Sequence, residues 1–255
     1  MDFSLLADQN PFGSFLISAD IERELLTVSK DQEPSAYLRY VFRIVKAAIG
    51  FNESGRYYPV WGTCLGFESL LLVLSNLQVE ITAGLDDVNF LHPVVFDLSK
   101  KSVFNAIISE NDFKQLETEE LLYFNHDYGY LYEQTVNHPF VRENIDILAK
   151  MTTSKGIDVV AAYQHKKYPF AGIQYHPEKN QFIFSDGMPK TRSDKLTDVG
   201  RDHARVVATL FKEAHSSIDF KTFQQLREGM GQIFDDGNQS EAFYFGPYPS
   251  VADLL

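Results

Sequence analysis

The sequence is poor in cysteine and in basic residues, and it contains no long apolar run. The single cysteine, Cys64, excludes an internal disulfide framework and a multi-cysteine zinc site. The 23 Lys and Arg residues are outnumbered by 35 Asp and Glu residues, which gives a formal net charge of −12. Proteins that bind nucleic acids or anionic membranes normally present a basic face, so this balance argues against both classes. No apolar run reaches the roughly 18 residues that a membrane-spanning helix needs.

The beginning of the chain also lacks the features of a secretory signal peptide. The segment MDFSLLADQNPF is acidic and has no long apolar stretch. Hydrophobic residues make up 44% of the 255 residues, which is enough to build the core of one large domain. We therefore expect a single domain over residues 1–255, in which 1–34 are divergent and 216–255 form a C-terminal extension.

Helical and strand patterns alternate along the chain. Apolar spacing predicts helices over residues 35–50, 65–75, 103–109, 112–124 and 196–215. Short apolar runs predict strands over 57–62, 79–83, 92–98, 156–165 and 168–176, with Lys166 and Lys167 as the turn of a hairpin. Residues 84–87 read as a turn and 177–195 as a polar loop. Strands mixed with helices predict an α/β domain with a sheet covered on both faces.

The lone cysteine lies in the pentapeptide Gly62-Thr63-Cys64-Leu65-Gly66, between a predicted strand and a predicted helix. A nucleophile elbow has this form, because a side chain on either glycine would clash in the tight turn. The helix N-terminus would favour a thiolate, and the N–H of Leu65 could donate to an oxyanion. The alternative is a buried cysteine in a glycine turn. The pentapeptide by itself supports a nucleophile elbow and a buried cysteine equally. The apolar strand before it and the apolar helix after it favour the elbow.

A thiolate nucleophile needs a base, and His176 is the strongest candidate. It ends the apolar segment PFAGIQY and is followed by Pro177-Glu178. Residues i and i+2 of an extended segment point to the same side, so Glu178 can reach the imidazole of His176. The alternative is a strand end with two solvated polar side chains. Five other histidines are expected to be solvated or structural, two of them on a surface helix: His92, His138, His165, His203 and His215.

Two segments together resemble one family. PVWGTCLGFE (59–68) and YPFAGIQYHPEK (168–179) are similar to the two signature blocks of folate γ-glutamyl hydrolase, a member of the class I glutamine amidotransferase-like superfamily. LYFNHDYGY (122–130) resembles the family's Asn-Phe-His segment, and the similarity runs from about residue 35 to 211. The resemblance implies a flavodoxin-like sheet with helices on both faces and an ω-peptidase that hydrolyses the γ-glutamyl bonds of folate polyglutamates through a thioester.

The resemblance also implies roles for individual residues. Cys64 corresponds to the nucleophile, His176 to the general base and acid, and Glu178 to the group that orients His176. His126 falls at a position that binds substrate or polarises the transition state. Glu68 either contacts substrate or is an ordinary acid in the first turn of a helix. No metal or organic cofactor is implied, the partner is a small-molecule substrate, and a homodimer is left open.

The chain departs from the family pattern before Cys64. Only 63 residues precede it, and they contain no Pro-Gly-Gly turn, whose N–H completes the family's oxyanion hole. Either the first strands of the sheet are missing, or Asn10–Ser14 is an altered remnant in which Gly13 supplies the donor. An impaired or inactive paralogue, or a hydrolase of another small γ-glutamyl compound, therefore remains an alternative. By resemblance we expect a lysosomal, vacuolar or extracellular protein, although this chain shows no signal peptide.

Overall fold

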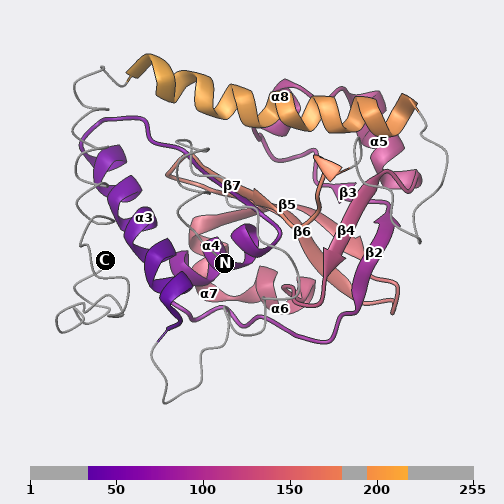
Figure 1. The fold of residues 1–255 in the computed structure, drawn as a ribbon, viewed down its shortest axis with the longest axis horizontal. Helices are drawn as coiled ribbons and strands as arrows, with labels where there is room; N and C mark the ends of the chain where they lie inside the picture. Colours follow the sequence, from indigo (N-terminus) through magenta and orange to yellow (C-terminus); the bar gives the residue numbers. More distant parts are fainter. Residues whose placement is uncertain (1–33, 180–193, 218–255) are drawn as a thin grey trace, which may run out of the picture.

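The computed structural model describes residues 34–179 and 194–217, which form an α/β domain (Figure 1). Its main sheet has five strands in the order β1 (Val60–Thr63), β7 (Phe170–Ile173), β6 (Asp158–His165), β5 (Ile145–Thr152) and β3 (Val95–Phe96). β1 and β7 pair in parallel, and the remaining neighbours pair antiparallel. A separate antiparallel pair consists of β2 (Asp87–His92) and β4 (Leu122–His126). The sheet is thus mixed, with its one parallel pair at the β1 edge.

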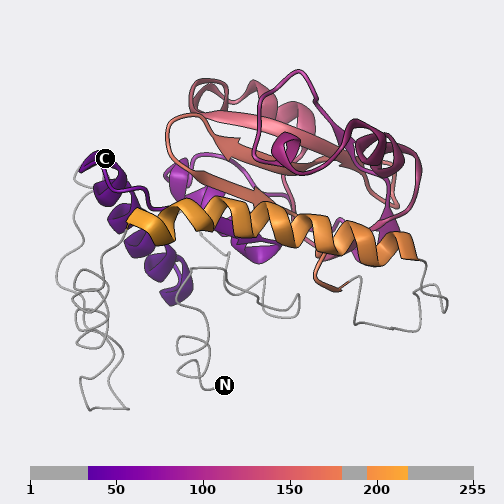
Figure 2. The same ribbon diagram turned by 90° about the horizontal axis from the view of Figure 1, so that it is seen from above.

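Both faces of the main sheet are covered, as predicted. One face packs against α3 (Ala36–Glu53), α4 (Leu65–Leu74), α6 (Tyr132–Asn137) and α7 (Pro139–Asn144). The other face packs against the β2–β4 pair, the 3₁₀ turn η2 (Phe104–Ala106), α5 (Glu110–Thr118) and α8 (Asp194–Ser217). Figures 1 and 2 show α8 running along one side of the molecule, apart from α6 and α7. Alternate residues of a strand serve the two cores, as with Val60 and Trp61 in β1.

The helix that follows the cysteine is buried along its whole length. All ten residues of α4 are buried, because the segment is apolar on every side and packs between α3 and the sheet. Ser35 caps the N-terminus of α3, because its hydroxyl accepts a hydrogen bond from the N–H of Leu38 at 3.1 Å. The predicted end of α3 at Gly50 is wrong. The helix continues to Glu53, because a glycine inside a helix weakens it without necessarily breaking it.

The strand and helix predictions were right where one pattern dominated. β1, α4 and the β6–β7 hairpin around Lys166 and Lys167 are confirmed. Residues 79–83 form no named strand and contribute a single bridge from Thr82 to Gly129. The helix predicted over 112–124 is wrong in its second half. It ends at Thr118, and the apolar run that follows becomes the buried strand β4. β5, α6 and α7 were not predicted, and residues 92–98 are divided between β2 and β3.

His203 lies on α8, and of the two roles expected for it, solvated or structural, the structural one is confirmed. His203 is 1% exposed, its Nδ1–H donates to the carbonyl of Val199 at 2.9 Å, and its Nε2 lies 3.0 Å from the hydroxyl of Tyr175. Val206 is buried on the same face of α8, as predicted, and Val199 and Val207 pack beside it. Leu210, Phe211, Ala214 and His215, which were also assigned to this helix, have side chains outside the described residues.

No helix in residues 34–179 and 194–217 is long and apolar enough to cross a bilayer.

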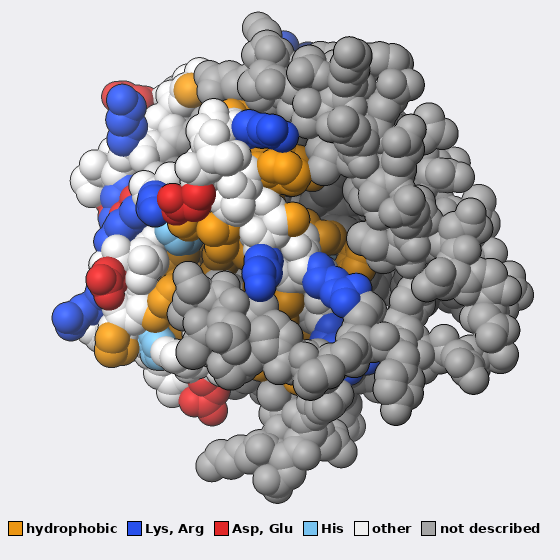
Figure 3. All heavy atoms as spheres, turned by 90° about the vertical axis from the view of Figure 1, so that its left-hand side faces the viewer, with side chains coloured by type: hydrophobic (Ala, Val, Ile, Leu, Met, Phe, Trp, Pro, Cys, Tyr) orange, Lys and Arg blue, Asp and Glu red, His pale blue; other side chains and the backbone are white. Residues whose placement is uncertain are grey.

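One face of the molecule carries basic side chains. Figure 3 shows the side of the molecule that carries α3, where Lys and Arg side chains lie between patches of hydrophobic surface. Local positive charge therefore exists on this face, although the chain as a whole is acidic.

Candidate active site

Cys64 occupies a sharp turn between β1 and α4. Its backbone has φ 53° and ψ −114°, a region that residues with a side chain seldom adopt, at a strain of about 1–3 kcal/mol. Two backbone hydrogen bonds hold the turn. The N–H of Cys64 donates to the carbonyl of Ile173 at 2.9 Å, and its own carbonyl accepts from the N–H of Glu68 at 3.0 Å. The conformation predicted for a nucleophile elbow is therefore present at the cysteine.

Gly62 is required by the close approach of the two sides of this turn. A Cβ on Gly62 would lie 2.4 Å from the carbonyl oxygen of Gly66 and 2.7 Å from the nitrogen of Phe67. Both are backbone atoms, which cannot move aside without opening the turn. Leu65 begins α4, so its N–H is among the first-turn donors that have no acceptor within the helix.

The thiol of Cys64 is enclosed by polar groups from two other segments. Cys64 is 1% exposed, and its Sγ–H donates to the carbonyl of Asn125, at the end of β4, at 3.8 Å. The amide Nε2 of Gln174 lies 3.9 Å from Sγ and donates to Oε1 of Glu68 at 2.7 Å. Glu68, in the first turn of α4 as predicted, and Gln174 are both completely buried.

His176 and Glu178 form the predicted pair. The two atoms Nδ1 and Oε1 are 2.7 Å apart, and the side chain of His176 is 2% exposed while that of Glu178 is 39% exposed. Burial lowers the pKa of His176, and the hydrogen bond and charge of Glu178 act in the opposite direction. With Nδ1–H donated to Glu178, a neutral imidazole carries its lone pair on Nε2, where it can accept a proton.

The sheet brings the cysteine and the histidine to one edge. Thr63 and Ile173 are register partners in the parallel pair β1–β7, and both strands end there. Cys64 directly follows β1, and His176 follows β7 by three residues. The carboxyl ends of parallel strands are where α/β sheets carry their ligands and reacting groups.

His126 is buried beside this edge within a second polar cluster. Its Nδ1–H donates to the carbonyl of Tyr128 at 2.7 Å, and its Nε2 lies 3.8 Å from Oδ2 of Asp87. Asp87 accepts hydrogen bonds from Nε2 of His92 and from the N–H of Ser154, each at 3.0 Å. Both ring nitrogens of His126 thus face protein atoms.

Titration in this cluster follows from burial. Burial lowers the pKa of His126 to about 4 and outweighs the opposing effects of the hydrogen bond to Tyr128 and the charge of Asp87, while the charge that His176 can carry acts weakly in the same direction as burial. Burial acts to raise the pKa of Asp87, but the hydrogen bonds from His92 and Ser154 outweigh it, so its pKa lies below the usual value. Asp87 is therefore a buried carboxylate charge near the site.

Among the described residues, no group of three or more His, Cys, Asp or Glu side chains could hold a metal ion.

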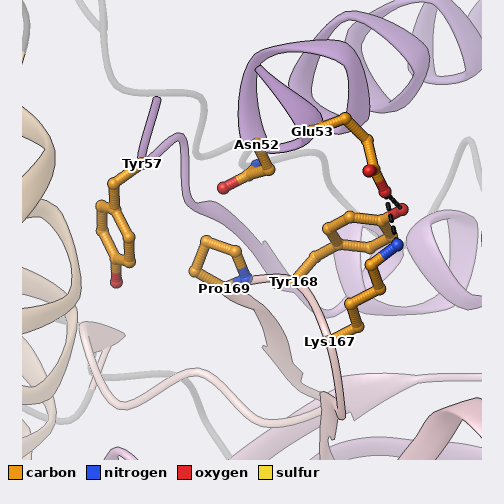
Figure 4. Close-up of a pocket in the computed structure, with 6 residues that line it drawn as sticks. All are labelled: Asn52, Glu53, Tyr57, Lys167, Tyr168 and Pro169. Atoms are coloured by element: carbon orange, nitrogen blue, oxygen red, sulfur yellow. Dashed lines mark hydrogen bonds and ion pairs between the residues drawn. The ribbon is translucent and has the colours of Figure 1, made fainter. Parts of the chain in front are cut away.

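A surface cavity of about 450 Å³ opens at the opposite end of the same two strands (Figure 4). Its lining comes from the end of α3 and from the segments that precede β1 and β7: Asn52, Glu53, Tyr57, Lys167, Tyr168 and Pro169. Glu53 accepts from Nζ of Lys167 at 2.5 Å and from the hydroxyl of Tyr168. Because Tyr57 and Pro169 precede the strands that Cys64 and His176 follow, this cavity does not belong to the cysteine site.

Comparison with known proteins identifies the family of the chain. The sequence profile of the family described as glutamine amidotransferase class-I matches residues 39–190, which is more than half of the chain. The chain belongs to the class I glutamine amidotransferase family. The amidotransferase-like α/β fold predicted from the signature blocks is thereby confirmed. Cys64, His126, His176 and Glu178 all lie within the matched amidotransferase segment.

Curated relatives of this amidotransferase-family chain carry the name of one enzyme. Gamma-glutamyl hydrolase 1 of Arabidopsis thaliana is 29% identical over 148 residues, which cover 57% of this chain and 42% of that protein. Gamma-glutamyl hydrolase of Homo sapiens is 29% identical over 153 residues, which cover 59% and 47%. The chain thus spans about half the length of the curated relatives that it matches. A solved glutamine amidotransferase from Thermotoga maritima is 15% identical, with 82% and 74% of the two chains covered and a TM-score of 0.37, too low to carry an argument.

Three of the polar residues around Cys64 and His126 were not identified from the sequence. Gln174 could have been noticed, because it lies two residues before His176 in an extended segment and so points to the same side. Asp87 was assigned to a turn and His92 to the solvated or structural histidines, and nothing local indicated that Asp87 lies between His92 and His126. Gly13, the predicted remnant of an oxyanion donor, lies outside the described residues.

Proposed function

We propose that the protein hydrolyses γ-glutamyl bonds with Cys64 as nucleophile, and that its substrates are folate polyglutamates. The observation that carries this proposal is a cysteine in a strained strand–helix turn, at the same sheet edge as a buried histidine paired with a carboxylate. Relatives named gamma-glutamyl hydrolase support the choice of bond. The resemblance of the two signature blocks supports the choice of a folate polyglutamate.

The first half of the reaction is an acyl transfer to sulfur. His176 accepts the thiol proton, and the sulfur forms a bond to the γ-carbonyl carbon while the carbonyl oxygen becomes an oxyanion. The N–H of Leu65, at the start of α4, is our candidate donor to this oxyanion. When the tetrahedral intermediate collapses, the carbon–nitrogen bond breaks, His176 returns its proton to the leaving amine, and a γ-glutamyl thioester remains.

The second half releases the acyl group to water. A water molecule gives a proton to His176 and attacks the thioester carbon, so that the carbon–sulfur bond breaks and the thiol is restored. Glu178 keeps the Nδ1–H tautomer in place through both halves, because its carboxylate accepts that hydrogen at 2.7 Å. Burial supports the neutral state of His176 that both steps require, because it lowers the pKa of the imidazole.

A polyglutamate tail carries several negative charges and needs positive charge near the site. The start of α3 lies close to the helix that follows the cysteine, since the hydroxyl of Tyr37 lies 3.0 Å from that of Ser69 in α4. α3 also carries Arg39, Arg43 and Lys46, and its side of the molecule shows basic side chains in Figure 3. These residues are our candidates for contacts with the tail.

The near-complete burial of the thiol favours a second candidate. Cys64 is 1% exposed, so a substrate must displace other atoms to reach the sulfur. A small γ-glutamyl compound would displace fewer atoms than a long polyglutamate tail. A paralogue without turnover would not need access to the sulfur at all.

On the family resemblance we also propose a lysosomal, vacuolar or extracellular location, which imaging of a tagged full-length protein would test.

The proposal is tested by incubating the purified chain with a folate polyglutamate and measuring the glutamate released. We expect turnover that disappears in Cys64→Ala, with Cys64→Ala shown to be folded by circular dichroism. Turnover of small γ-glutamyl amides alone would select the second candidate. A folded wild-type protein that releases glutamate from neither substrate would reject both reactions.

A further inference from the structure

Gln174 joins the two buried polar groups at the start of α4. Its backbone N–H donates to the carbonyl of Ala161 at 2.9 Å, which anchors the residue just beyond the end of β7. From there its amide Nε2 donates to Oε1 of Glu68 at 2.7 Å and lies 3.9 Å from Sγ of Cys64. A primary amide nitrogen has two hydrogens in a fixed plane, so it can direct one to each neighbour.

The contact with Glu68 decides which way the amide points. In the reversed orientation, Oε1 of Gln174 would face a carboxylate oxygen at 2.7 Å, and two acceptors at that distance repel each other. The nitrogen therefore lies on the side of Glu68 and Cys64. Because Gln174 is completely buried, the amide is not free to rotate into water and exchange these contacts.

The sulfur consequently lies between groups with opposite preferences. The carbonyl of Asn125, 3.8 Å away, can only accept, so it favours the protonated thiol. The Nε2–H of Gln174 can only donate, so it favours the thiolate, and a donor directed at a charged acceptor contributes about twice as much as one directed at a neutral acceptor. When Cys64 loses its proton, the contact with Asn125 becomes repulsive and the contact with Gln174 becomes stronger.

We infer that Gln174 is a positioning residue, whose amide holds the Cys64 sulfur and the Glu68 carboxylate together and favours the thiolate. Its consequence for catalysis rests on the proposed role of Cys64 as nucleophile. Its effect on the thiol does not depend on any substrate. Neither the spacing of the elbow nor the His176–Glu178 pair implies this role.

The chain allows a direct test because it has one cysteine. The thiolate absorbs in the ultraviolet, so the difference in absorbance between each protein and its Cys64→Ser counterpart, followed against pH, reports the titration of Cys64 alone. Gln174→Met keeps the length of the side chain and removes both N–H groups. We expect the midpoint to rise by about one pH unit, the shift that corresponds to the loss of a hydrogen bond to a charged group. Gln164→Met is the matched control, because the amide of Gln164 donates to the carbonyl of Lys101 and should leave the midpoint unchanged.

A second comparison covers the case in which Gln174→Met does not fold, since that change withdraws a donor from the buried Glu68. Glu68→Gln and the double variant Glu68→Met/Gln174→Met both lack the negative charge; the first keeps the amide of Gln174, and the second replaces both polar side chains by methionine. Replacing both partners of a buried hydrogen bond by apolar groups of similar shape is close to neutral for folding. We expect the midpoint of the double variant to lie about one unit above that of Glu68→Gln.

An unchanged or lowered midpoint in Gln174→Met, or in the double variant relative to Glu68→Gln, would overturn the inference. This outcome is distinct from failure of the proposed hydrolysis, because the titration needs no turnover. If wild type does hydrolyse γ-glutamyl bonds, the acidic limb of its kcat/KM profile should move in Gln174→Met by the same amount as the thiol midpoint.

Discussion

Replacing Gly62 by alanine should disrupt the turn on which the site depends. The added Cβ would lie 2.4 Å from the carbonyl oxygen of Gly66, whereas ordinary contacts begin at 3.4 Å. The end of β1 and the first turn of α4 must therefore separate by about 1 Å, because the clashing atoms are backbone and have no rotamer to change. Overpacking of this kind costs about 1–3 kcal/mol, which lowers the melting temperature of a domain of this size by roughly 2–12 °C.

The same displacement should affect catalysis more than stability. Cys64 lies two residues from Gly62, and a misplacement of about 1 Å in a catalytic group can reduce the rate by about 10²-fold. We expect Gly62→Ala to remain folded at 25 °C with little or no γ-glutamyl hydrolysis. Calorimetry and the glutamate-release assay would measure the two effects on the same sample.

Gly50→Ala is the matched control for Gly62→Ala. Gly50 lies within α3, and no atom lies within 4 Å of the position that a Cβ would take. The substitution should therefore stabilise the protein by about 0.5–1 kcal/mol, because alanine loses less backbone entropy than glycine in a helix. If Gly62→Ala melted at the temperature of wild type, or if both variants were destabilised equally, the steric explanation of the elbow would be wrong.

Three further predictions concern Glu178 and the buried polar groups. Glu178→Gln should lower kcat/KM about 10²–10⁴-fold with little change in KM, since it removes the charge that holds the tautomer of His176; an unaltered kcat/KM would exclude the orienting role. The free energy of unfolding should fall as the pH drops from about 6.5 towards 4, because buried His126 and His203, whose pKa values lie at about 4, stay neutral while the unfolded chain binds protons. His203→Gln should reduce this slope in urea titrations between pH 7 and pH 5, and a slope equal to that of wild type would contradict the assignment. Asp87→Asn should destabilise the protein by about 1–3 kcal/mol at pH 7, because His92 and Ser154 lose an ionised acceptor, and an unchanged urea midpoint would show that the cluster adds nothing to stability.

Local patterns predicted the part of the fold that carries Cys64. The strand β1, the turn at Cys64 and the helix α4 are contiguous, and each has its own signature: an apolar run, flanking glycines and a second apolar run. The His176–Glu178 contact was predictable for the same reason, since two residues at spacing i, i+2 in an extended segment meet without help from the rest of the chain.

Predictions failed where a short apolar segment could serve more than one structure. The run that became β4 continues the apolar residues of a helical pattern, and nothing within it distinguishes a buried strand from a helix. β5 pairs with two strands at once, and its residues gain their strand conformation from those partners. The burial of His203 likewise depends on which face of α8 meets the sheet.

The sequence by itself determined the elbow, the histidine–carboxylate pair and the family, because these depend on residues that are neighbours along the chain or on blocks in a set order. The tertiary structure alone decided what surrounds them. Gln174 meets Glu68 across 106 positions of sequence, and Ser154 meets Asp87 across 67. Such contacts depend on the register of β1 against β7 and on the packing of the β2–β4 pair, and a shift of one residue in a strand would turn each side chain to the opposite face.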